Sequence, residues 1–277
     1  MTDLYCQFCW IFNLFFKTVD VDVIVSRSMH FSKLHCSSRS AVVVYSFAST
    51  IVQSKFWTQL FTYTFLLGIL AIDMLQIIQI EASEMDNFSY LIYCPETLQG
   101  ATVDPSMRPE RVLQKAAELG VKLRLLLNTH GHQDHTAGNE LILKSSGAKL
   151  AAHPDDLPNP DIPLTEGLKL ELGNGIIEVI HTPGHTPGSV IFKIDNQIIT
   201  GDTLFVSRCG RADLPGSDVV ALYESLQRLK KLPGETRIYP GHDYGPTVTS
   251  TLDWELKNND YFKCPNLQSF TKLRLET

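Results

Sequence analysis

Residues 128–139 read NTHGHQDHTAGN, and they place three histidines and one aspartate within six positions shortly after the apolar run VKLRLLL. Neutral imidazole nitrogens and carboxylate oxygens are the usual ligands of zinc and of similar transition metals. A loop that leaves a strand can direct His130 and His132 to one side and Asp134 and His135 to the other. The segment therefore indicates two metal ions, and it requires a fold that brings further ligands to the end of this strand.

Three further candidate ligands stand just after expected strands, at places where the chain turns. His185 lies in HTPGHTPGS, Asp202 in ITGDTLF and His242 in YPGHDYG, and each directly follows a glycine. Glycine and proline suit a chain that turns tightly around a site. A carboxylate such as Asp202 can bridge two cations with its two oxygens. Two neighbouring sites are predicted on either side of Asp202, one with His130, His132 and His185 and the other with Asp134, His135 and His242.

From Met74 onward the chain alternates between short runs rich in β-branched and aromatic residues and helical patterns. The first set predicts strands followed by a helix over 108–120, with Pro109 near its first turn and Gly120 just past its end. A further strand then leads into the histidine loop, and a short helix follows it. The expected strands of this set are 75–80, 87–94, 100–105 and 122–128, and the short helix is 139–147.

A second set of strands follows, in which GNG (173–175) and DN (195–196) are turn signals that predict hairpins. A helix over 217–234 is expected to begin with Ser217 as its N-cap, and a last helix is expected over 248–262. Runs of strands with helices between them predict two sheets packed together and flanked by helices. The expected strands of this set are 148–153, 168–172, 176–181, 189–194, 197–200 and 236–240.

The first 73 residues form an atypical extension, because they contain one glycine and no proline, whereas all 14 prolines come later. Residues 56–72 carry no charge, and their length is at the short limit for a membrane span. Three interpretations stay open: a membrane anchor, an appended segment of unknown role, or a misassigned start with Met74 as the natural first residue. We therefore divide the chain into an extension, 1–73, and a domain, 74–277.

Charge and cysteine content narrow the class of partner and the compartment. The net charge is −6 and the chain has no run of lysine and arginine, which argues against nucleic acid and favours a small-molecule substrate. The six cysteines lack the spacing of a disulfide framework, so we expect free thiols in a reducing, cytoplasmic compartment. Membrane contact is expected only if residues 56–72 are a true anchor.

The segments THGHQDH, HTPGHTPG, TGDTLF and PGHDYG, in this order and spacing, resemble the metallo-β-lactamase superfamily over about residues 75–265. The resemblance implies an α+β fold, a four-layer αββα sandwich with the metal site at one edge between the sheets, here preceded by an extra N-terminal segment. It also implies the same seven metal ligands, namely His130, His132, Asp134, His135, His185, Asp202 and His242.

Within that superfamily, GDTLFVSRCGRADLPGSD and GHDYG look most like the glyoxalase II branch, the hydroxyacylglutathione hydrolases. Asp202 argues against β-lactamase activity, because true β-lactamases lack the bridging aspartate. The resemblance implies thioester hydrolysis by a hydroxide held between two divalent ions, with zinc expected first and iron or manganese as alternatives. Asp134 is expected to orient the hydroxide or accept its proton, Tyr244 to contact glutathione and Arg211 to hold a substrate carboxylate.

Two alternatives remain at this stage. Persulfide dioxygenases share the CGR-x-D pattern (209–213) and an HDY segment (242–244), but use one iron to oxidise glutathione persulfide. Glyoxalase II also has a long helical C-terminal region that helps to bind glutathione. Here about 35 residues follow His242, so it stays open how this chain would bind glutathione. A metal-stabilised binding module without activity is less favoured, because structural zinc sites are usually closed and four-coordinate. His153 and His181 are expected outside the ligand set, and His30 and His35 receive no role.

Overall fold

The computed structural model describes residues 75–82 and 85–276. The extension 1–73, with its candidate span 56–72 and with His30 and His35, lies outside the described residues. Within the described part, no helix is both long enough and apolar enough to cross a membrane. The cysteines described there, Cys94, Cys209 and Cys264, are free, as expected.

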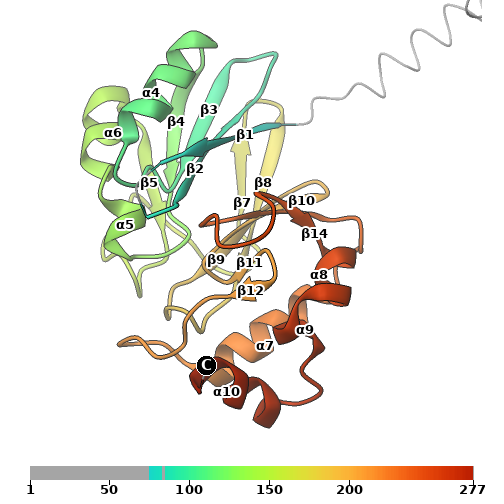
Figure 1. Ribbon diagram of the computed structural model, residues 1–277. Helices are drawn as coiled ribbons and strands as arrows, with labels where there is room; N and C mark the ends of the chain where they lie inside the picture. The colour runs from blue at the N-terminus through green and yellow to red at the C-terminus, as the bar shows by residue number, and fades with distance from the viewer. Residues whose placement is uncertain (1–74, 83–84, 277) are drawn as a thin grey trace, which may run out of the picture. The chain divides into compact units, whose positions relative to one another are not determined.

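Six strands that follow one another in the chain form the first sheet (Figure 1). They are β1 (Gln76–Glu81), β2 (Phe88–Tyr93), β3 (Gln99–Val103), β4 (Lys122–Leu127), β5 (Lys149–Ala152) and β6 (Ile162–Pro163). Strands β1 to β3 are antiparallel neighbours, whereas β3 to β6 run parallel. Parallel neighbours require a crossover, and helices α4 (Pro109–Glu118) and α6 (Asn139–Ser146) provide two of them.

The second sheet has the order β14-β13-β10-β9-β8-β7. Its strands are β7 (Lys169–Leu172), β8 (Gly175–His181), β9 (Val190–Ile194), β10 (Gln197–Gly201), β13 (Arg237–Pro240) and β14 (Ser250–Thr251). The predicted hairpins are confirmed, because β7 pairs with β8 and β9 with β10 in antiparallel fashion. Strands β10 and β13 run parallel, so their carboxyl ends lie side by side.

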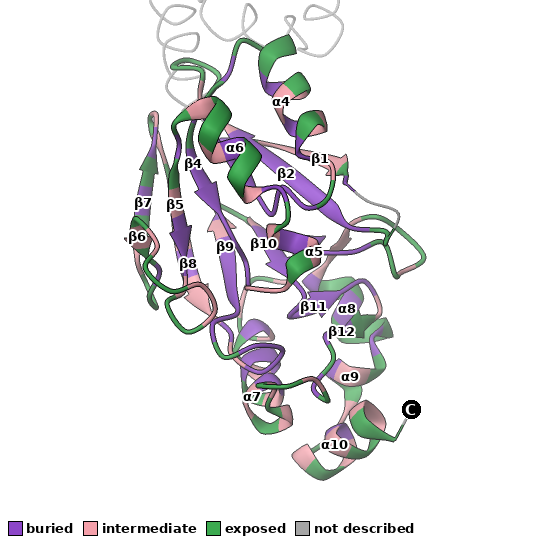
Figure 2. Ribbon diagram, turned by 90° about the vertical axis from the view of Figure 1, so that its left-hand side faces the viewer, coloured by how far each residue is buried: buried purple, intermediate pink, exposed green. Residues whose placement is uncertain are grey.

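Alternation along the central strands distributes apolar side chains among three cores. In β2, Tyr90 and Ile92 enter the core between the sheets, whereas Leu91 joins the core under α4 and α6. In β9, Phe192 enters the core between the sheets and Ile191 joins the core on the opposite face. This follows from the two-residue period of a strand. The predicted αββα sandwich is confirmed, with buried strands in the middle and the exposed faces of α4 and α6 turned outward (Figure 2).

Two details of the helices differ from expectation. Helix α7 (Val219–Leu229) is capped by Asp218, whose carboxylate accepts hydrogen bonds from two backbone amides, and not by Ser217. The Ser217 hydroxyl instead donates to the carbonyl of Leu214 at 2.7 Å. The region expected to form one last helix contains β14 and two short helices, and a third helix follows. These are α8 (Leu252–Asn258), α9 (Asp260–Lys263) and α10 (Leu267–Leu275).

Candidate metal centre

The histidine loop begins at the carboxyl end of β4, where Asn128, Thr129 and His130 are all buried. One helical turn, α5 (Gln133–Thr136), follows and carries Asp134 and His135. Because β3, β4 and β5 run parallel, the segments that follow them meet at one edge of the first sheet. In open α/β sheets, ligands bind at this edge.

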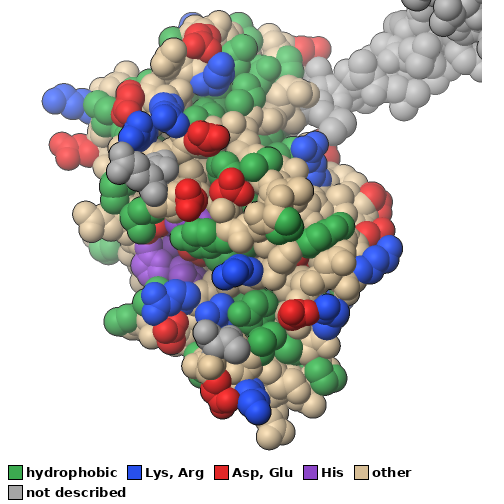
Figure 3. Space-filling model, viewed as in Figure 1, with side chains coloured by type: hydrophobic (Ala, Val, Ile, Leu, Met, Phe, Trp, Pro, Cys, Tyr) green, Lys and Arg blue, Asp and Glu red, His purple; other side chains and the backbone are tan. Residues whose placement is uncertain are grey.

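The second sheet brings its candidates to the same place. Asp202 directly follows β10, and His242 follows the parallel neighbour β13, while His185 lies in the loop between β8 and β9. Gly241 lies between Pro240 and His242, and a Cβ atom there would stand 2.3 Å from the Asp202 carboxylate. Glycine is therefore required at position 241 by the close approach of the Asp202 side chain. Figure 3 shows a patch of histidine side chains on one face of the molecule, although His185 and His242 are themselves almost fully buried.

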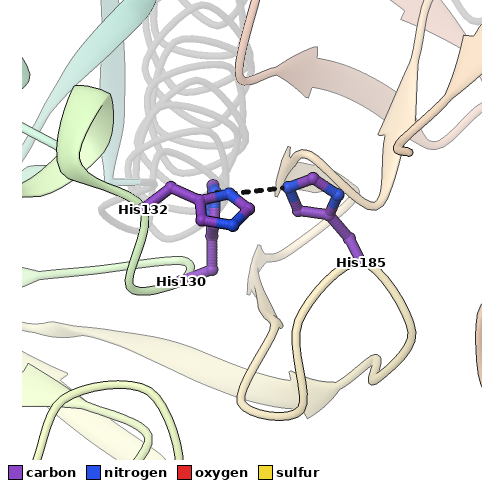
Figure 4. A group of neighbouring side chains, drawn as sticks. All are labelled: His130, His132 and His185. Carbon is purple, nitrogen blue, oxygen red and sulfur yellow. Dashed lines mark hydrogen bonds between the residues drawn. The ribbon is translucent and has the colours of Figure 1, made fainter. Parts of the chain in front are cut away.

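The first ligand group consists of His130, His132 and His185, whose rings point toward one another (Figure 4). His132 Nδ1 lies 3.0 Å from His130 Nε2 and 3.0 Å from His185 Nε2. One ligand atom from each residue lies within 4.8 Å of the others, which is close enough for all three to bind one metal ion. The structure thus brings together the three residues that the sequence analysis assigned to the first site.

The second ligand group consists of Asp134, His135 and His242. The Nε2 atoms of His135 and His242 are 3.1 Å apart. The Asp134 Oδ2 atom lies 3.4 Å from His242 Nε2 and 3.5 Å from His135 Nε2. This is the second predicted group, and it differs from the first in containing a carboxylate.

Asp202 contacts both groups. Its Oδ2 atom lies 3.6 Å from His185 Nε2 in the first group and 3.4 Å from His242 Nε2 in the second. Its Oδ1 atom lies 3.2 Å from His135 Nε2 but is buried without a hydrogen-bond partner among the described residues. A buried polar atom without a partner is costly unless another ligand satisfies it. A divalent cation at this position would satisfy it, so the residues present fit a metal centre.

The outward ring nitrogens of two ligands are fixed by backbone carbonyls. His185 Nδ1 lies 2.9 Å from the carbonyl oxygen of Arg211, and His242 Nδ1 lies 3.0 Å from that of Met85. A carbonyl only accepts, so each Nδ1 atom carries the proton when the ring is neutral, and each Nε2 atom presents a free lone pair. This arrangement is typical of metal-binding histidines.

Asp104, which the sequence analysis did not single out, fixes the ring of His135. The Asp104 Oδ2 atom lies 3.0 Å from His135 Nδ1 and also accepts the Thr129 hydroxyl at 2.6 Å, while Oδ1 accepts the Thr129 amide at 2.8 Å. The Thr129 hydroxyl in turn lies 3.0 Å from His130 Nδ1. Asp104 therefore connects one ligand of each group. Its position just after β3 was the available signal, because β3 is the parallel neighbour of β4.

Two more polar residues brace the ligands and were also missed. Asn87 donates to Asp134 Oδ2 at 2.9 Å, directly beside the second group. Asp156 accepts the amides of Gly131 and Gly188, each at 2.8 Å, and the hydroxyl of Thr186 at 2.6 Å. Asp156 thus ties the loop of His130 and His132 to the loop of His185. Asp156 lies in a loop between expected strands and Asn87 is the first residue of the expected strand 87–94, so neither position carried a specific signal for this role.

The two groups differ in how readily their imidazoles take up protons. Burial lowers the pKa of His130 well below its usual range, and burial together with nearby His185 lowers that of His132. Burial also opposes the cationic form of His135 and His242, but neighbouring carboxylates outweigh it. These are Asp202 and Asp104 at His135, and Asp134 and Asp202 at His242. The pKa of His135 is raised well above its usual range, and that of His242 is raised to about 9. The second group is therefore the one adapted to hold positive charge.

The two predicted substrate contacts lie in different environments. The Tyr244 ring stacks on His242 with centroids 4.5 Å apart, and 43% of the residue is exposed. Burial, with a contribution from Asp202, raises the pKa of Tyr244 to about 12, so its hydroxyl stays protonated. The Arg211 guanidinium forms a two-point ion pair with Asp213 at 2.9 and 2.8 Å. Tyr244 thus stands beside the cluster with its hydroxyl able to donate, whereas the Arg211 side chain is already paired.

The histidines expected outside the ligand set form a separate pair. His153 and His181 stack with ring centroids 4.5 Å apart and planes 8° from parallel. His181 Nε2 lies 2.9 Å from the carbonyl of Pro187. Neither histidine belongs to a metal-binding group within the described part of the chain.

Comparison with known proteins points in the same direction as the geometry. Residues 88–242 match the family model of the metallo-beta-lactamase superfamily. A hydroxyacylglutathione hydrolase from Rhodospirillum rubrum is 37% identical over 179 residues, which are 62% of this chain and 69% of that protein. The Bacillus velezensis protein named "Probable polyketide biosynthesis zinc-dependent hydrolase BaeB" is 32% identical over 196 residues, 68% of this chain and 87% of that protein.

A solved structure shares the fold as well. The crystal structure of ETHE1 from Myxococcus xanthus superposes with a TM-score of 0.69 and 29% identity. The superposition covers 72% of this chain and 89% of the ETHE1 chain.

Proposed function

The chain belongs to the metallo-beta-lactamase superfamily, and from this premise we propose that it is a metal-dependent hydrolase of thioesters of the hydroxyacylglutathione type. The observation that carries the proposal is the position of Asp202, whose carboxylate contacts both ligand groups at once. The Rhodospirillum rubrum relative supports the substrate class, and the zinc-dependent relative supports the use of a metal.

We assign the seven predicted ligands to two divalent ions, with Asp202 shared between them. Two such ions, when bound, supply Lewis acidity and a hydroxide at neutral pH, which is the standard two-metal route to hydrolysis. Zinc is the first choice, and iron or manganese would suit the same imidazole and carboxylate ligands. The ions would be held by His130, His132, His185, Asp134, His135, His242 and Asp202.

We assign Asp134 the role of orienting the attacking water. Its Oδ2 atom is fixed by the Asn87 amide at 2.9 Å, and its side chain is 20% exposed. Asp134 is therefore a ligand carboxylate that is both held in place and open toward solvent. No serine or cysteine nucleophile is needed in this scheme.

Tyr244 and Arg211 are the proposed substrate contacts. The protonated Tyr244 hydroxyl can donate a hydrogen bond to the glutathione portion of a thioester bound beside His242. The Arg211 guanidinium is 59% exposed and paired with Asp213, which is 48% exposed. An exposed pair of this kind contributes little stability, so a substrate carboxylate could replace Asp213 at small cost. We propose that the enzyme acts in a reducing compartment, which the free thiols of the described cysteines support.

The second candidate function is oxidation of a persulfide by a single iron, and the likeness to ETHE1 is the observation that favours it. Two assays on the same anaerobically purified protein separate the candidates. We expect slow to moderate release of free thiol from S-lactoylglutathione and no oxygen uptake with glutathione persulfide. Rapid, iron-dependent oxygen uptake without thioester cleavage would move the protein to the dioxygenase class.

A further inference from the structure

Glu255, in α8, is a fully buried carboxylate that the proposed chemistry does not use. Its Oε2 atom accepts the Ser207 amide at 2.9 Å and the Asn259 side-chain amide at 2.8 Å. Its Oε1 atom is buried without a hydrogen-bond partner among the described residues, and burial raises the pKa of the Glu255 carboxyl. A buried carboxylate is costly, and a leucine would fill a similar volume without that cost. Packing alone therefore does not account for glutamate at this position.

Glu255 and Asn259 hold the turn of a small hairpin formed by β11 (Leu204–Phe205) and β12 (Arg208–Cys209). Ser207, in this turn, has a φ of 65°, in the left-handed region that non-glycine residues seldom adopt. Glu255 accepts the Ser207 amide, and the Asn259 side chain donates to the carbonyl of Arg208 at 3.1 Å. The amide of Ser207 and the carbonyl of Arg208 are thus held by Glu255 in α8 and by Asn259, the residue that follows α8.

The hairpin places an aromatic ring beside the proposed substrate contact. Phe205 packs edge-on against Tyr244, with centroids 5.2 Å apart, and against His242 at 5.8 Å. The turn also abuts the residue after Tyr244, because a Cβ atom at Gly245 would lie 2.5 Å from the Val206 Cβ. A shift of the turn would therefore move the Phe205 ring that packs against Tyr244, and it would also move the backbone at Gly245, the residue after Tyr244.

We propose that Glu255 is a positioning residue for substrate binding, which acts by fixing the β11–β12 turn and thereby the Phe205 ring against Tyr244. The inference rests on the proposed function, since Tyr244 is a proposed substrate contact. The hydrogen bonds that Glu255 accepts come from Ser207 and Asn259 and from none of the seven proposed ligands, so we expect its removal to weaken substrate binding while metal is retained.

The test compares Glu255→Leu with Glu255→Gln. The glutamine oxygen can accept both hydrogen bonds, while its amide nitrogen takes the position of the unpartnered Oε1. We expect Glu255→Leu to raise KM for the best thioester substrate about tenfold with kcat and metal content unchanged, the pattern of lost uniform binding. Glu255→Gln is expected to stay within about twofold of the wild type. Phe270→Leu, in the apolar core that also contains Leu252 of α8, is the control for lost packing and should leave KM unchanged.

Hydrogen exchange read by mass spectrometry tests the positioning step independently of turnover. Glu255→Leu should increase exchange in residues 203–210 and also in 243–245, whereas Glu255→Gln and Phe270→Leu should not. Three results would overturn the inference: unchanged KM in Glu255→Leu, metal loss in that variant, or equal impairment by Gln and Leu. If the wild type cleaves no thioester, the proposed function fails, and the exchange pattern alone decides the role of Glu255.

Discussion

The two ligand groups lie side by side and use similar residues, yet they differ in charge. The group of His130, His132 and His185 contains only imidazoles, and burial lowers the pKa of two of them. The second group adds Asp134, and nearby carboxylates raise the pKa of its two imidazoles. The charge difference arises because Asp134 belongs to the second group alone, whereas Asp202 contacts both groups. Asp202 contacts residues of both groups, so we expect its removal to affect both, whereas removal of one histidine should affect mainly its own group.

The largest effect is expected from Asp202→Ala, which removes the bridge from both groups. Losing several kcal/mol of charge stabilisation should lower kcat by about three orders of magnitude and deplete both metals. Metal analysis and thioester turnover measure the two effects. His153→Ala is the matched control and should change neither, since His153 lies outside both groups. Equal metal loss in the two variants would mean that the ligand set is misassigned.

A smaller effect is expected from Gly241→Ala, which alters no ligand. The added Cβ atom would stand 2.3 Å from Asp202 Oδ1, so the carboxylate must move. Displacement by about an ångström at a reacting centre costs on the order of a hundredfold in rate. Steady-state kinetics with metal analysis would detect it. Wild-type activity in this variant would show that the position of Asp202 is not critical.

Acidification should separate the two groups. Metal binding needs neutral imidazoles, and a raised pKa means that protons compete with metal up to a higher pH. As pH falls, the group of His135 and His242 should release its ion first, and the group of His130 and His132 should retain its ion longer. Metal per chain, measured across a pH series in His132→Ala and in His242→Ala, assigns each loss to a group. The reverse order of release would contradict the charge difference between the groups.

The smallest effect is expected from removing the extension. We propose that residues 1–73 supply no ligand to either group and no core strand, so a chain spanning 74–277 should turn over within about twofold of full length. Comparison of kcat and metal content checks this. Loss of one metal equivalent on truncation would show that the extension completes one of the groups. A peptide from residues 1–73, found in protein from its native source, would exclude Met74 as the natural start.

The sequence indicated the candidate ligands and most strands because their signals are local. Gly184, Gly201 and Gly241 each directly precede a ligand, and strand alternation predicts which faces are buried. Asp104 and Asp156 were missed because their hydrogen-bond partners come from other elements, and no local pattern marks an acceptor for distant amides. These residues became recognisable only when the parallel strands brought their loops together.

The helix errors have a similar cause. Ser217 and Asp218 are both good capping residues, and only the contact of the Ser217 hydroxyl with Leu214 decides between them. The region after β13 was expected to form one helix, but Asn259 adopts an extended conformation there and caps α9 instead. Asparagine competes with helical hydrogen bonds in this way. The Asn259 side chain also donates to the carbonyl of Arg208, which is distant in the sequence, and no local pattern predicts that contact.

The most direct test of the central claim is the metal content of anaerobically purified wild-type protein, compared with His132→Ala and His242→Ala. Each variant removes one ligand from one group and leaves Asp202 in place. We expect two metal equivalents per chain in the wild type, about one in each variant, and thioester hydrolysis that requires both. A wild type that is fully active with a single equivalent, which His132→Ala loses and His242→Ala retains, would contradict the shared two-metal centre.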